Sequence, residues 1–137
     1  MTATTRLRVF LAGNAALYAG GAALFALRPD RTVRDLGRVG GAPPSDDGVW
    51  NALAVAYMAT IATTAAAAAA SDRSRRRGLL PVLLAGKVAS SAMFVRQYVR
   101  TGARGYLVGV ATDVPLAVAT AAFALAASRE SVPVAVS

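Results

Sequence analysis

Two charged residues, Lys87 and Asp113, are the positions in this sequence best suited to chemistry. Each lies well inside a long apolar segment, whereas the other formal charges fall at segment ends or between segments. An ammonium group and a carboxylate in such surroundings can relay a proton, hold a cation or orient the polar group of a ligand. Ser90 and Ser91 follow Lys87 by about one helical turn, which also allows a serine–lysine hydrolytic dyad. We favour the simpler interpretation that both serines belong to a polar helix face.

Other catalytic chemistry is restricted by what the sequence lacks. It contains no cysteine, which excludes disulfides, thiolate metal sites and covalent c-type haem attachment. It contains no histidine, the commonest metal ligand and general base. Asp113 is the one acid inside the apolar segments, so a two-carboxylate mechanism has no second member. We therefore expect no enzyme activity, no metal and no cofactor.

The composition indicates a membrane protein. Hydrophobic residues make up 55% of the 137 positions and charged residues only 16%, a balance that soluble domains of this size rarely show. The net charge of +8 could suggest nucleic acid, but the arginines flank apolar segments, where they meet anionic lipid headgroups. The expected partner is the lipid bilayer, including anionic lipids, and no nucleic acid.

Four segments are long enough to cross a membrane. Each holds 20 or so residues, and at about 1.5 Å per residue such a helix matches a hydrocarbon core of about 30 Å. A cleaved signal peptide is the competing interpretation of the first, but Arg28-Pro29-Asp30 offers no good cleavage site, so we expect the segment to be retained. The sequence predicts an all-α integral membrane protein, with four transmembrane helices in an antiparallel bundle and a single domain over residues 1–137. The predicted spans are 7–27, 49–70, 78–98 and 105–127, with 71–77 as a hydrophilic hairpin loop.

The connector 28–48 differs sharply from the spans. Val33, Leu36 and Val39 recur every three residues with arginines between them, which fits a short helix lying in the membrane interface. A solvated loop fits this short run equally well. Arginines divide equally between the two sides of the membrane, and the densest cluster lies in 73–77. Because loops rich in arginine favour the cytoplasmic side, this cluster places both termini in the cytoplasm. We expect the protein to lie in the cell membrane.

Lys87 and Asp113 are expected to contact each other. One such charge at the middle of a bilayer costs at least about 2.5–3.5 kcal/mol, which favours pairing. The third and fourth spans are joined by a short connector and should be antiparallel neighbours. Counted from the ends of that connector, Lys87 lies roughly 16 Å deep and Asp113 roughly 12 Å, a difference that a lysine side chain covers.

Other polar residues recur in phase with this pair, one set on each span. The four polar helix faces can meet along one line inside the bundle, which we call the seam, while Leu, Val, Ala and Phe face lipid. In one interpretation the seam only fixes helix register. In the other, Lys87 or Asp113 binds or relays a ligand. The predicted buried polar seam consists of Lys87, Asp113, Asn14, Tyr18, Tyr57, Thr60, Ser90, Ser91 and Thr120.

Three further arginines, Arg96, Arg100 and Arg104, follow one another at intervals of four residues. They are candidates for holding an anionic lipid headgroup or a phosphate. Ordinary anchoring at the membrane interface explains them equally simply, and we prefer it.

The layout resembles that of the small four-span bacterial membrane proteins grouped as DoxX-like. The shared features are Pro29 followed by Leu36-Gly37 after the first span, Trp50 at the start of the second, and charged Lys87 in the third. The resemblance implies an accessory role, since some members are considered accessory subunits of membrane redox systems. The expected function is an accessory or assembly protein, or a small-molecule or lipid-binding protein, acting in a larger membrane complex or homo-oligomer. The alternative is a small proton- or ion-coupled transporter.

Overall fold

The protein is all-α, as the sequence predicts. The computed structural model describes residues 1–40 and 48–130, without the side chains of residues 39–40 and 48–50. These ranges form five helices and no strand. The helices are α1 (Ala3–Leu27), α2 (Pro29–Gly40), α3 (Gly48–Ala70), α4 (Arg73–Thr101) and α5 (Gly105–Arg129).

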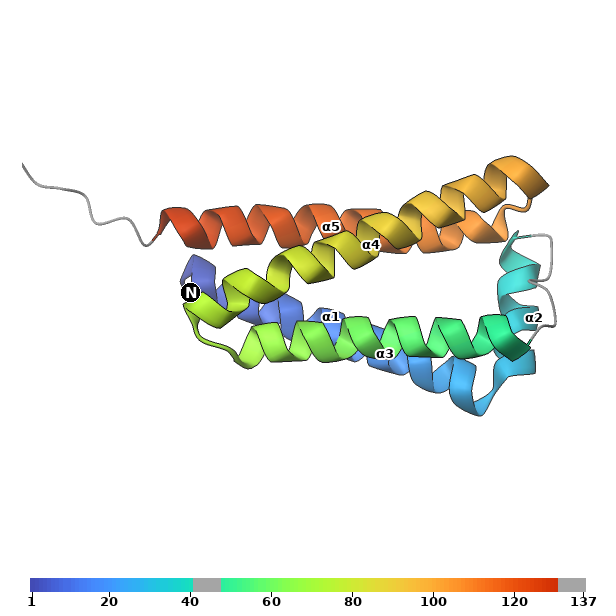
Figure 1. Ribbon diagram of the computed structural model, residues 1–137, viewed down its shortest axis with the longest axis horizontal. Coiled ribbons are helices and arrows are strands. Elements are labelled where there is room, and N and C mark those ends of the chain that lie inside the picture. The colour runs from blue at the N-terminus through green and yellow to red at the C-terminus, as the bar shows by residue number, and fades with distance from the viewer. Residues whose placement is uncertain (41–47, 131–137) are drawn as a thin grey trace, which may run out of the picture.

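Four of these helices are long and apolar enough to cross a membrane, namely α1, α4, α5 and the Asn51–Ala70 part of α3. They alternate in direction along one common axis, so the molecule is a multi-pass antiparallel bundle (Figure 1). Neighbours around the bundle follow the order α1, α3, α4, α5 and back to α1. The chain is thus arranged as a closed ring of helices, each of which faces a common centre.

The short helix α2 confirms that part of the connector 28–48 is helical. It runs across the end of the bundle and contacts both α1 and α5 (Figure 1). The Thr32 hydroxyl connects it to the end of α1, because this hydroxyl lies within hydrogen-bond distance of the carbonyl oxygens of Arg28 and Leu24, at 2.9 and 3.1 Å. The helix ends at Gly40, and the sequence that follows is rich in glycine and proline, the residue types least favourable to a helix.

The prediction that residues 71–77 form a hydrophilic loop is wrong from residue 73 onward. α4 already begins at Arg73, because the Asp72 carboxylate accepts a hydrogen bond from the Arg75 backbone N–H at 2.9 Å and caps the helix. Arg76 is buried rather than solvated, and its Nε donates to the carbonyl oxygen of Ala68 at 2.9 Å. Its guanidinium also donates to Ser71, so this one side chain satisfies two carbonyls at the C-terminal end of α3.

The two ends of the described chain are held together at the same end of the bundle. The Glu130 carboxylate accepts hydrogen bonds from the backbone N–H groups of Ala3 and Thr4, at 2.9 and 3.1 Å. Thr2 caps the same helix by accepting from the Thr5 N–H at 3.1 Å. Glu130 thus supplies the acidic group that the positive end of α1 attracts. These bonds hold the pKa of the Glu130 carboxyl below its ordinary value.

This contact predicts a pH dependence of stability. Because the folded pKa of Glu130 lies below the unfolded one, its stabilisation is fully present above the unfolded pKa of about 4.3. It is lost as the pH falls through the folded pKa. Thermal unfolding in detergent, followed by circular dichroism, should show the melting temperature of the native protein falling toward that of Glu130→Gln over this range. Parallel pH curves for the two proteins would contradict the prediction.

Buried side chains are unevenly distributed along the bundle. Those of Leu7, Leu11, Ala65, Ala68 and Leu83 lie toward the termini. Beyond Tyr18 on α1, before Ile61 on α3, after Lys87 on α4 and before Asp113 on α5, every described residue is at least partly exposed, although the Ser91 hydroxyl oxygen and Asn51 Oδ1 are themselves buried. Figure 1 shows why: toward α2, the α4–α5 pair diverges from the α1–α3 pair. We call the part near the termini the tight half and the part near α2 the splayed half.

Two glycines permit close contacts with α3. A Cβ atom on Gly21 of α1 would lie 2.9 Å from the Met58 sulfur, and one on Gly86 of α4 would lie 2.9 Å from Cδ1 of Ile61. Small residues at such contacts let helix backbones approach closely in a membrane, where packing rather than water drives association. Gly86 precedes Lys87, so this close approach also places α3 beside the buried lysine.

Candidate functional site

One polar side chain from each of the four long helices meets at the centre of the bundle. Tyr18 comes from α1, Tyr57 from α3, Lys87 from α4 and Asp113 from α5. We call these four residues the polar node. Lys87 is 0% exposed and Asp113 3%, so water reaches neither charge in this structure. The node lies at the boundary between the tight half and the splayed half.

Lys87 and Asp113 form the predicted ion pair, with Tyr18 between them. The Lys87 Nζ lies 3.9 Å from Asp113 Oδ1 and donates a hydrogen bond to the Tyr18 hydroxyl oxygen at 2.7 Å. That hydroxyl in turn donates to Asp113 Oδ1. The Lys87 ammonium also lies 4.0 Å from the centroid of the Tyr18 ring, a cation–π distance. Tyr18 therefore stabilises both charges at once.

Tyr57 completes the set from α3. Its hydroxyl lies 3.2 Å from the Gly86 carbonyl oxygen and 3.4 Å from Asp113 Oδ2. A hydroxyl has one proton to donate, so it bonds to one of these acceptors at a time. Ser90 interacts with the same hydroxyl from the next turn of α4. Asp113 can thus accept from both tyrosines, one on each carboxylate oxygen.

Two more residues of the predicted seam carry polar atoms that find no partner among the described residues. Both side-chain polar atoms of Asn14 are unpaired, and the residue is 2% exposed. The Ser91 hydroxyl oxygen is buried and unpaired as well. Asn14 precedes Tyr18 by one turn and Ser91 follows Lys87 by one turn, so they flank the node on opposite sides along the bundle. Buried polar atoms without partners are uncommon and mark places where a protein binds something else or stores strain.

Two other predicted seam residues do not join the node. Thr120 is fully buried, but its hydroxyl donates to the Leu116 carbonyl of its own helix at 2.6 Å. Thr60 was placed wrongly, because it is exposed and bonds to the Ala56 carbonyl at 2.8 Å. The buried face of α3 instead continues from Tyr57 through Ile61. Ile61, four residues after Tyr57, lies on that face, whereas Thr60, three residues after Tyr57, points away from it.

Arg96, Arg100 and Arg104 are all exposed, near the junction of α4 and α5. Their predicted contact with lipid headgroups stays a prediction. The Trp50 side chain lies outside the described part of the chain. The sequence reasoning missed Arg76, whose burial it had no means to separate from that of its exposed neighbours Arg75 and Arg77.

The chemistry available to the node follows from its composition. It contains one base, one acid and two hydroxyls, so it can neutralise charge, bind a polar group or pass a proton between hydrogen-bonded oxygens and nitrogen. Among the described residues, no three carboxylate, histidine or cysteine side chains gather as a metal site would require. No protein family, curated protein or solved structure matches this chain.

Proposed function

We propose that this chain is a small multi-pass accessory protein that works by binding, either to a partner membrane protein or to an apolar or lipid-like ligand. The observation that carries this proposal is the splayed half, in which the faces of four apolar helices are at least partly exposed at every described residue. A partner helix or ligand that entered there would cover those faces and reach the node. The layout resemblance to DoxX-like accessory proteins supports the same conclusion.

The state of the node also favours binding over turnover. Its two charges neutralise each other and are bonded by two tyrosines, so the site is held in one arrangement without a substrate. Buried groups of this kind fix the register of neighbouring helices. We further propose a plasma-membrane location with both termini in the cytoplasm, since the arginines of 73–77 lie at the termini end of the bundle.

Site-specific photo-crosslinking in native membranes tests this proposal. A photoreactive residue replaces Leu53 or Val95 in the splayed half, and Val118 or Leu125 serves as a matched exposed control in the tight half. We expect one discrete protein or ligand adduct from the first pair and none from the second. The adduct should co-purify with the tagged chain in mild detergent. Equal labelling of both halves, or labelling by bulk lipid alone, would overturn the proposal.

A second candidate is a proton- or ion-coupled transporter, which the unpaired polar atoms of Asn14 and Ser91 on either side of the node favour. In that case Asp113→Asn abolishes proton flux into proteoliposomes while the protein remains folded in the membrane. The native protein must itself move protons in this assay. Flux equal to that of empty vesicles removes this candidate and leaves the binding proposal unaffected.

A further inference from the structure

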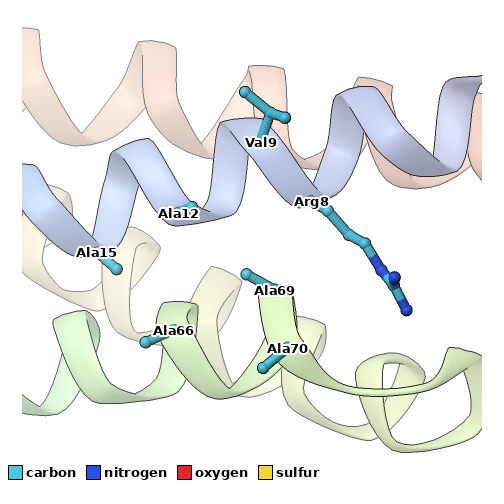
Figure 2. Close-up of a pocket in the computed structure, with 7 residues that line it drawn as sticks. All are labelled: Arg8, Val9, Ala12, Ala15, Ala66, Ala69 and Ala70. Atoms are coloured by element: carbon cyan, nitrogen blue, oxygen red, sulfur yellow. The ribbon is translucent and has the colours of Figure 1, made fainter. Parts of the chain in front are cut away.

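A hollow on the outside of the tight half is separate from the node. It lies between α1 and α3, has a volume of about 530 Å³ and is lined mostly by alanine. Figure 2 shows alanine side chains of α1 and α3 on the two sides of this hollow, with the Arg8 side chain extending past one end. We call it the alanine groove, and its lining residues are Arg8, Val9, Ala12, Ala15, Ala66, Ala69 and Ala70.

The groove has an apolar stretch and one charged end. From Arg8 to Ala15 it extends about 10 Å along α1. Arg8 donates a hydrogen bond to the Ser71 carbonyl at 3.1 Å, so its guanidinium reaches the level of the α3–α4 connection. The helices end at this connection, which places the positive charge at headgroup depth and the alanines farther from the helix ends, Ala12, Ala15 and Ala66, at acyl-chain depth.

A second, weakly formed hollow adjoins the first. Ala70 lines both, so the two hollows meet at the C-terminal end of α3. Arg75 contributes the positive charge of the second hollow. Its one acidic lining residue, Asp72, is engaged as the cap of α4. The two hollows beside the end of α3 are thus lined by one arginine each, Arg8 and Arg75.

We propose that the alanine groove binds an anionic phospholipid, with an acyl chain between α1 and α3 and the phosphate beside Arg8 and Arg75. Charge decides between this occupant and a second copy of the chain. A two-fold copy would bring Arg8 toward Arg8, whereas an anionic lipid supplies the opposite charge. Basic pockets between membrane helices bind anionic headgroups in this way. The site lies in the tight half, so it stands independently of the function proposed for the splayed half.

Native mass spectrometry of the delipidated protein in detergent tests this site. Phosphatidylglycerol and phosphatidylcholine are titrated separately, with glycerol phosphate as the probe that lacks acyl chains. We expect phosphatidylglycerol to bind more tightly than phosphatidylcholine and glycerol phosphate not to bind. Arg8→Ala should weaken phosphatidylglycerol binding about fivefold, the effect of one arginine at a membrane surface. Arg6→Ala, which removes an exposed charge from the same helix outside the groove, should not.

A second pair of variants tests the apolar part of the groove separately from its charged end. Ala12→Leu fills the groove and should abolish retention of the lipid, whereas Ala16→Leu adds the same volume at an exposed position outside it. Circular dichroism and elution volume confirm that each variant is folded. Equal retention of the two lipids, equal effects of the two arginine variants, or loss of a dimer instead of a lipid in Ala12→Leu would each overturn the proposal.

Discussion

Replacing Asp113 with alanine is expected to lower the free energy of unfolding by about 3–5 kcal/mol, because Lys87 then stays buried without its counter-ion. Lys87→Ala should have a similar effect through the uncompensated carboxylate. Combining Lys87→Met with Asp113→Leu should recover most of the loss, since no charge remains to be buried. The Tyr18 hydroxyl would still lack both of its partners, a residual cost of about 1–3 kcal/mol.

The measurement is a double-mutant cycle on unfolding in mixed micelles of mild and denaturing detergent, in which Lys87→Met and Asp113→Leu are also made singly. Thr60→Ala is the matched control, because Thr60 is exposed and its substitution should change stability by no more than about 0.5 kcal/mol. Strictly additive losses from the two single variants would contradict the pairing. A double variant that is stable but gives no photo-crosslinked adduct would show that the node takes part in binding and does more than fix the register of the helices.

Gly109→Ala is expected to destabilise the contact between α4 and α5 by about 1–3 kcal/mol, the usual cost of overfilling a packed site. A Cβ atom at this position would lie 2.3–2.8 Å from three atoms of the Phe94 ring. The Phe94 ring must therefore move. It lies on α4 one turn beyond Ser90 and Ser91. Phe94→Leu in the same chain should relieve the clash and restore stability.

Gly20→Ala provides the control for this experiment, because a Cβ atom at Gly20 meets no other atom within 4 Å. Removing a helical glycine there should leave stability unchanged or slightly higher, in keeping with the greater helix propensity of alanine. The same unfolding measurement applies. Equal behaviour of the two glycine variants would mean that Phe94 yields without cost and that α4 and α5 are not held by this contact.

The Lys87–Asp113 contact could be predicted because two strong constraints agree. Charges in the middle of an apolar helix must find partners, and a short connector makes α4 and α5 neighbours at matching depth. Tyr18 and Tyr57 could be assigned to the seam from helical phase. Phase alone misplaced Thr60. A step of three residues turns about 60° to one side of the starting residue and a step of four about 40° to the other, and only packing decides which side is inward.

Other features depend on contacts that no local pattern encodes. Arg76 is one of several adjacent arginines, and its burial follows from the exposed carbonyls at the end of α3. Glu130 caps a helix that lies more than a hundred residues earlier in the chain. The splayed half arises from the divergence of the α4–α5 pair from the α1–α3 pair, which depends on the packing of whole helices (Figure 1).

The uneven packing of the bundle has a consequence for the surrounding bilayer. A molecule that is narrow near its termini and wide near α2 is a wedge, and it occupies more area in one leaflet than in the other. By shape alone, such a wedge fits a curved bilayer better than a flat one.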